Sequence, residues 1–274
     1  MDGRNDARWR RSALVVALVA IAGAAAPAIA QPAFPDSMAA IGDSITRATD
    51  ACCFYGDHPD QSWSTGFNPL GPVVSHYERV LAANPSIGAN AFNDARAGAK
   101  MDEANGQATL AVSQGAEYVT ILMGANDVCT SSRSTMTPVA EFRAQFQAAM
   151  ETLTSGLPGS HVFVASIPNV RRLWRILHDD PVARLVWRTA QICQSMLAAS
   201  NTAADRQAVY DREVAFNQAL GEVCAAYANC RFDDGAVFGY RFARDQVSTL
   251  DYFHPDLDGQ AALARITWRR SWWA

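Results

Sequence analysis

The chain has 274 residues, of which 49% are hydrophobic and 18% charged, and its formal net charge is −4. This composition excludes an intrinsically disordered chain, and the sequence has neither the glycine periodicity of collagen nor the charge-rich heptads of a coiled coil. A weakly acidic balance also lacks the basic footprint of a nucleic-acid-binding protein, so no nucleic-acid partner is expected.

The first thirty residues predict a targeting segment. A basic head precedes an uncharged run, 12–30, which ends in the small-x-small pattern Ala-Ile-Ala that signal peptidases require. The alternative is a membrane anchor, which the alanine- and glycine-rich end of the run disfavours. We therefore expect a signal peptide over 1–30 that is cleaved near Ala30. The mature chain, 31–274, is expected to be exported, and the sequence leaves open whether it is periplasmic or extracellular.

Strand and helix patterns alternate along the mature chain. Apolar runs of strand length are found at Ser37–Ile41, Tyr118–Met123 and His161–Ile167. Helical periodicity is found at Met101–Gln114, Pro138–Leu157 and Asp205–Tyr227. This order predicts an α/β fold with a parallel sheet covered on both faces. No repeat or linker interrupts it, so a single domain is expected.

Ligands of such sheets bind beyond the carboxyl ends of the strands, and four polar motifs lie at predicted strand ends or helix starts. They are Ile41-Gly42-Asp43-Ser44, Asn93-Asp94-Ala95-Arg96-Ala97-Gly98-Ala99, Gly124-Ala125-Asn126-Asp127 and Asp251-Tyr252-Phe253-His254. Taken singly, each motif has a structural interpretation as a turn, a loop or a helix cap. Their occurrence together and in this order indicates one composite site.

This set of motifs resembles the four sequence blocks of the SGNH (GDSL) hydrolase family, and the match runs over 41–254. The resemblance implies a flavodoxin-like, three-layer α/β/α sandwich with a central, parallel, five-stranded sheet. It also implies that Ser44 is the nucleophile, that His254 is the general base and that Asp251 orients the histidine. Further details are similar to secreted bacterial lipases and phospholipase B-like members, namely the segment 62–66, the segment 167–170 with Leu173-Trp174, and the paired cysteines.

By the same resemblance, an oxyanion hole is expected from Ser44, Gly98 and Asn126. Supporting roles are expected for Asp43, Gly124 and Asp127, with Asp127 holding the loop that aims Asn126.

Elementary chemistry agrees with these roles. A serine hydroxyl is a poor nucleophile until a base takes its proton, and a histidine with a pKa of about 6.5 is mostly neutral near pH 7. The imidazolium that forms needs a carboxylate, and Asp251 stands three residues before His254. The tetrahedral oxyanion needs donors aimed at it, which two backbone amides and one carboxamide would supply.

Ser113 is a rival nucleophile, since the sequence around it is a variant of the hydrolase elbow. An elbow needs a strand before the serine and a helix after it. The predicted order here is the reverse, so Ser113 is rejected.

The mature chain keeps all six cysteines, and an even count in an exported protein favours disulfides. Cys224 and Cys230 are close enough to join a helix end to the following strand, and Cys129 with Cys193 would form a longer tie. The remaining candidates, Cys52 and Cys53, are adjacent and could form only a strained vicinal bridge. The sequence has no Cys-x-x-Cys pair and no histidine cluster, so neither a metal nor a cofactor is expected.

The expected function is that of an exported serine esterase or lipase that forms an acyl-enzyme on lipid or lysophospholipid esters. A carbohydrate O-acetyl esterase is the alternative within enzymes, because the same triad serves acetylated sugars. A non-catalytic binding module is the alternative outside them. The aromatic and basic tail, 268–273, fits either transient contact with a lipid surface or packing on the domain. The protein is expected to be a monomer.

Overall fold

The computed structural model describes residues 1–2 and 31–274, so the predicted signal peptide lies outside the described residues. Five parallel strands form the central sheet in the order β2-β1-β3-β4-β5. They are β1 (Met38–Gly42), β2 (Ala91–Asn93), β3 (Tyr118–Leu122), β4 (His161–Val164) and β5 (Cys230–Phe232). Every residue of β1 and β3 is buried, as expected for strands covered on both faces. The predicted α/β fold with a five-stranded parallel sheet is confirmed.

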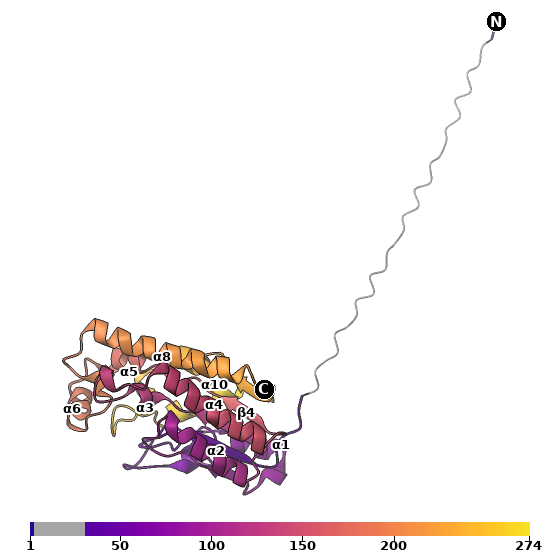
Figure 1. Cartoon of the computed structure of the whole chain (residues 1–274), viewed down its shortest axis with the longest axis horizontal. Helices are drawn as coiled ribbons and strands as arrows, with labels where there is room; N and C mark the ends of the chain where they lie inside the picture. Colours follow the sequence, from indigo (N-terminus) through magenta and orange to yellow (C-terminus); the bar gives the residue numbers. More distant parts are fainter. Residues whose placement is uncertain (3–30) are drawn as a thin grey trace. The chain divides into compact units, whose positions relative to one another are not determined.

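Helices cover both faces of this sheet. Within the described residues they are α1 (His76–Ala83), α2 (Ala104–Ser113), α3 (Ala125–Val128), α4 (Val139–Gly156), α5 (Val170–Leu177), α6 (Pro181–Thr189), α7 (Gln194–Leu197), α8 (Ala203–Cys224), α9 (Ala236–Gly239) and α10 (Leu257–Trp268). Helices α2, α4 and α8 pack side by side (Figure 1). Tyr118 contacts α1 from the other side of the sheet, because alternate residues of a strand face opposite ways. Residues Pro32–Ala274 form one compact unit.

Most predicted elements are confirmed, and the differences have local causes. Strand β4 ends at Val164, earlier than predicted, and the residues after it form hydrogen bonds with side chains of other elements. Ser166 donates to Asp233, and the amide of Ile167 donates to Asn217 of α8. The helix predicted from Met101 begins as a 3-10 turn. Helices α1 and α6 were not predicted.

The cysteine predictions are partly corrected. Disulfides join Cys129 to Cys193 and Cys224 to Cys230, as expected. Cys52 and Cys53, however, are both free thiols. The backbone between them forms a tight turn in which the amide of Phe54 donates to the carbonyl of Cys52 at 2.7 Å, with φ at +64° for Cys53. The turn takes the place of the vicinal bridge.

The C-terminal tail packs on the domain. Trp273 is buried, stacks on Trp268, and donates through Nε1 to the backbone carbonyls of Pro32 and Ala33. The packing interpretation of Trp268 is therefore confirmed, and Trp273 is not available to a lipid surface. In the part of the chain that the structure describes, no helix combines the length and apolar character needed to cross a membrane.

Candidate active site

The turn after β1 brings Ser44 to the carboxyl edge of the sheet, beside the end of β3. The sheet order reverses direction between β1 and β3, and this is where ligands of doubly wound sheets bind. Gly42 is required at the turn, because a Cβ there would lie 2.7 Å from the carbonyl oxygen of Leu122. The side chain of Gln107 in α2 holds Gly42 in place with two hydrogen bonds, because it accepts from the amide of Gly42 and donates to the carbonyl of Gly42. Ser44 follows and is almost fully buried.

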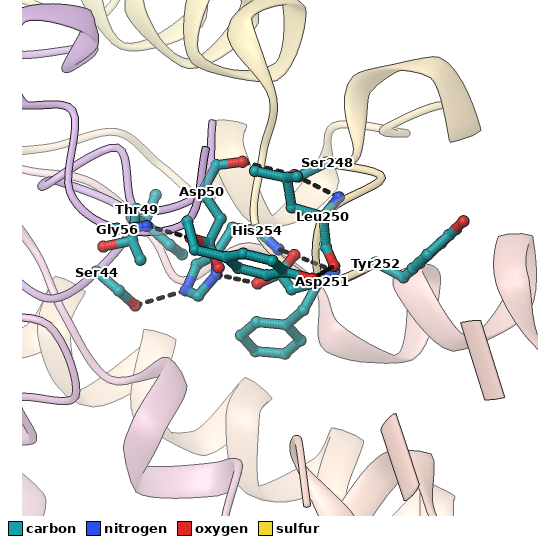
Figure 2. Close-up of polar contacts among 12 residues, drawn as sticks. Ser44, Thr49, Asp50, Gly56, Ser248, Leu250, Asp251, Tyr252 and His254 are labelled. Carbon is teal, nitrogen blue, oxygen red and sulfur yellow. Dashed lines mark hydrogen bonds and ion pairs between the residues drawn. The ribbon is translucent and has the colours of Figure 1, made fainter. Parts of the chain in front are cut away.

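Ser44, His254 and Asp251 form an unbroken chain of hydrogen bonds (Figure 2). His254 Nδ1 lies 2.5 Å from Asp251 Oδ2, and His254 Nε2 lies 2.7 Å from Ser44 Oγ. Since Nδ1–H donates to the carboxylate, Nε2 is left to accept from the serine hydroxyl. The other oxygen of Asp251 accepts from the amides of Phe253 and His254, which fixes the carboxylate in place. The structure thus brings together the three residues singled out as a triad.

The electrostatics of the triad stabilise the imidazolium form of His254 and the ionised form of Asp251. Burial works against the cation, but the hydrogen bond and charge of Asp251 raise the pKa of His254 above its ordinary value. Burial likewise works against the carboxylate, yet the hydrogen bond and charge of His254 hold the pKa of Asp251 below its ordinary value. Burial raises the pKa of Asp43, which accepts from the amide of Ile45, to about 7.

The expected oxyanion donors each keep at least one hydrogen that no other described residue accepts. Among the described residues, the amides of Ser44 and Gly98 have no hydrogen-bond acceptor, so both are free to serve a ligand. Gly98 has a φ of +81°, which a residue with a side chain rarely adopts. Asn126 Nδ2 donates one hydrogen to the carbonyl of Ala99 at 2.9 Å, which leaves its second hydrogen for another acceptor.

The supporting residues hold these donors in place. Asp127 is fully buried and accepts from the amide of Met101 and the hydroxyl of Thr137, so it ties the Asn126 loop to the segment that follows Gly98. Burial raises its pKa to about 6. Gly124 has a φ of +125°, and a Cβ there would lie 2.5 Å from the side chain of Ile167.

One cluster in the described residues groups three possible metal ligands within 4.8 Å, namely Asp50, Asp251 and His254. Both imidazole nitrogens of His254 are already engaged, one by Asp251 and one by Ser44. The cluster therefore suits proton transfer better than metal binding.

An apolar pocket opens beside Ser44. Ile45, Ala125, Phe253 and Pro255 line it, and each is next to a residue of the site in sequence. The rest of the lining consists of Pro168, Asn169, Val170, Arg172, Leu173, Ile176, Phe242, Gln246 and Val247. Arg172 is the only charged residue in the lining, and its Nε donates to the carbonyl of Phe242. The pocket is lined by the chain neighbours of Ser44, Asn126 and His254, and most of its lining is apolar.

The sequence analysis did not identify Gln107 or Asp50. A buried glutamine in an otherwise apolar helix face was the available signal for Gln107. The only sequence signal for Asp50 was its position, six residues after Ser44. Conversely, the rejected Ser113 lies at the end of α2 and donates to the carbonyl of Leu110, away from the triad.

A model of the GDSL-like lipase/acylhydrolase family matches residues 40–262. This range contains all of the predicted site residues. No curated protein matches the chain.

Solved structures share the fold at low sequence identity. A protein described as a GDSL-like lipase from Parabacteroides merdae is 17% identical with a TM-score of 0.53, over 88% of this chain and 97% of its own. Phospholipase A1 from Streptomyces albidoflavus is 15% identical with a TM-score of 0.52, over 86% and 99% respectively. A salicylyl-acyltransferase from a tetracycline biosynthetic pathway is 14% identical with a TM-score of 0.54, over 88% and 55%.

Proposed function

The chain belongs to the GDSL-like lipase/acylhydrolase family and is a carboxylic ester hydrolase, and on that premise we propose an exported serine esterase or lipase that cleaves lipid esters. The observation that carries this proposal is the continuous hydrogen-bond chain from Ser44 through His254 to Asp251. Serine is activated as a nucleophile when its hydroxyl is hydrogen-bonded to a buried imidazole and that imidazole is hydrogen-bonded to a carboxylate.

In the first half of the reaction, Ser44 Oγ attacks the ester carbonyl while His254 Nε2 takes its proton. The new imidazolium is stabilised by Asp251, whose lowered pKa keeps it ionised. The carbonyl oxygen becomes an oxyanion that accepts from the amides of Ser44 and Gly98 and from the carboxamide of Asn126. Collapse of this intermediate expels the alcohol, which leaves with the proton from His254, and an acyl-Ser44 ester remains.

The second half runs the same steps with water. His254 takes a proton from a water molecule as that water attacks the acyl carbonyl, and the same three donors hold the oxyanion. Collapse then breaks the bond to Ser44 Oγ, which recovers its proton from His254. The carboxylic acid departs, and no metal or cofactor takes part in this proposed sequence.

The apolar pocket supports lipid esters as the substrate class. Its lining includes Ile45 and Phe253, the chain neighbours of Ser44 and His254, and this is where we place the acyl chain of the substrate. Removing each methylene of the chain from water contributes about 0.8 kcal/mol, so a longer chain should bind more tightly until the pocket is full. An acetyl group would leave most of this wall uncovered.

Export is supported by the two disulfides, because such bonds form and persist in oxidising compartments. The proposed signal peptide over 1–30 and a mature domain over 31–274 agree with this location. We propose cleavage near Ala30.

The test compares the wild-type protein with Ser44→Ala on p-nitrophenyl acetate, butyrate and palmitate. Wild type should hydrolyse butyrate or palmitate faster than acetate, and Ser44→Ala should lose at least about a thousandfold in kcat. A Ser113→Ala variant is the matched control and should keep full activity. A phosphonate ester probe should label wild type at Ser44 and leave Ser44→Ala unlabelled.

Other outcomes would point elsewhere. A preference for acetate over the longer esters would favour the carbohydrate O-acetyl esterase. Equal rates for wild type and Ser44→Ala on all three esters, together with no labelling, would contradict the proposal and favour a binding module.

A further inference from the structure

Asp50 lies beside the triad, although the proposed mechanism does not use it. One of its carboxylate oxygens, one of Asp251 and one nitrogen of His254 all lie within 4.8 Å of one another. The residue is largely buried, so its charge is poorly screened by water. Building on the function proposed above, we propose that Asp50 is a second carboxylate for His254, a positioning residue that stabilises the imidazolium and fastens its loop.

The carboxylate of Asp50 is held in a fixed place by its own loop. Its Oδ1 accepts from the amide of Gly56 at 2.7 Å, and its backbone amide donates to the carbonyl of Gly56 at 2.8 Å. Asp50 also has a φ of +55°, a left-handed conformation that is costly for a residue with a side chain. Strained backbone of this kind persists where the surrounding contacts over-determine it, and it gathers at functional sites.

The same residue joins the two loops that make up the triad. The hydroxyl of Ser248 donates to the backbone carbonyl of Asp50 at 2.5 Å (Figure 2). Ser248 in turn accepts at its carbonyl from the amide of Tyr252, and its amide donates to the carbonyl of His254. The loop that carries Asp251 and His254 is therefore attached to the segment that follows Ser44.

The charge contributions that raise the pKa of His254 are all from carboxyl groups. They come from Asp251 in its own loop, from Asp43 after β1 and from Asp50 in the loop beyond Ser44, and each of them raises the pKa of His254 against the effect of burial. Asp251 is the hydrogen-bonded partner and Asp43 faces the site from the turn that holds Ser44. Asp50 is thus the contributor that can be neutralised while the triad and the nucleophile turn stay intact.

Asp50→Asn tests this idea with little disturbance of the fold. Asparagine keeps an acceptor for the amide of Gly56, and it tolerates a left-handed backbone at least as well as aspartate. The readout is the pKa of His254, followed by NMR titration of its imidazole protons in the purified protein and assigned by comparison with His254→Gln. This measurement does not depend on hydrolysis, so it separates the present proposal from the proposed function.

Asp50→Asn should lower the pKa of His254 by at least about 0.6 unit, which is the effect of one charge at this distance even with water-like screening. The acid limb of kcat/KM on p-nitrophenyl butyrate should move to lower pH by the same amount. Because the imidazolium loses a stabilising charge, kcat on the plateau should fall severalfold while KM stays nearly constant.

Two controls separate charge from structure. Asp60→Asn removes an exposed carboxylate ten residues further along the chain and should leave the pKa of His254 unchanged. Ser248→Ala removes the tie to the carbonyl of Asp50 but keeps its charge, so kcat should fall without a shift of the acid limb. An unchanged pKa of His254 in Asp50→Asn would overturn the proposal, whether or not the wild-type protein hydrolyses esters.

Discussion

Asn126 contributes a carboxamide whose two hydrogens have different partners in the proposed mechanism. One donates to the carbonyl of Ala99 and holds the side chain in place. The other is left for the oxyanion, which exists only during the reaction. A donor of this kind acts on the barrier and has little effect on binding of the ester in its ground state.

Asn126→Ala should therefore lower kcat by about 10²–10³-fold, equivalent to about 2.7–4 kcal/mol, and change KM little. Steady-state kinetics on p-nitrophenyl butyrate measure both constants. The lost bond to Ala99 should cost about 1 kcal/mol of stability, which urea unfolding checks independently. A decrease in kcat of less than threefold in a folded variant would exclude Asn126 from the oxyanion hole.

The residues of the site differ in how far the sequence could reveal them. Ser44, Asn126 and His254 stand in short motifs with a chemical meaning of their own, and the structure brings them together. Asp50 carries no such signal, because its place beside His254 depends on a loop whose left-handed backbone is set by Gly56 and Ser248. Contacts across 198 residues, such as that of Ser248 with Asp50, have no counterpart in local sequence.

At the scale of elements, helix α8 supports the wall of the apolar pocket. Glu213 accepts from the amide of Val170 at 3.0 Å, and Asn217, one turn later, accepts from the amide of Ile167 at 2.8 Å. Glu213 is fully buried, and burial raises its pKa well above the ordinary value of 4.5. The folded protein therefore keeps this proton at a pH where the unfolded chain has released it.

This sets the sign of a pH dependence. The contribution of Glu213 to stability is fully present below about pH 4.5 and declines as the pH rises towards its folded-state pKa. Glu213→Gln keeps the acceptor and cannot ionise, so its free energy of unfolding relative to wild type should increase between pH 4.5 and 8. Urea unfolding at these two pH values provides the measurement. A relative stability that is the same at both would contradict the assignment.

Glu213→Ala makes a complementary comparison, because it leaves the amide of Val170 without its acceptor. It should lose about 1–3 kcal/mol of stability. Glu222→Gln changes an exposed glutamate on the same helix and should stay within about 0.5 kcal/mol of wild type.

The elements themselves were predictable where one pattern dominates. The buried strands β1 and β3 and the long helix α4 have continuous apolar runs or clear helical periodicity, and each of their observed bounds lies within one residue of the prediction. Helix α6 was missed because its apolar residues alternate with arginines, a pattern that also suits an exposed loop. The early end of β4 depends on side chains of other elements, which local periodicity cannot include.

At the scale of the whole molecule, His76 connects three parts of the chain that are far apart in sequence. Its Nδ1 accepts from the hydroxyl of Tyr118 in β3 at 2.7 Å. Its Nε2 donates to the hydroxyl of Thr267 in α10 at 2.7 Å, since that hydroxyl gives its own hydrogen to the carbonyl of Leu263. Trp63 and Trp268 pack edge-on against the ring. This pattern fits only the neutral imidazole.

Burial, with the nearby charge of Arg79, lowers the pKa of His76 to about 3. An unfolded chain binds a proton at this residue below about pH 6.5, whereas the folded protein does not. Stability from His76 is therefore fully present above pH 6.5 and declines as the pH falls towards 3, at a rate that approaches about 1.4 kcal/mol per pH unit. Acid should thus lower the free energy of unfolding of the whole protein from about pH 6.5 downwards, before most carboxylates titrate.

His76→Gln isolates this contribution, because subtracting the variant from wild type cancels the titration of every other group. The variant should be less stable at pH 7, because it loses the packing of the His76 imidazole and the two hydrogen bonds that this ring forms. The difference in free energy of unfolding should shrink by roughly 2 kcal/mol between pH 6.5 and 4.5, as measured by urea unfolding at half-unit steps. His178→Gln, at an exposed histidine, should show a difference near zero throughout. A gap between wild type and His76→Gln that stays constant with pH would mean that His76 is protonated in the folded protein, which its contacts with Tyr118 and Thr267 do not accommodate.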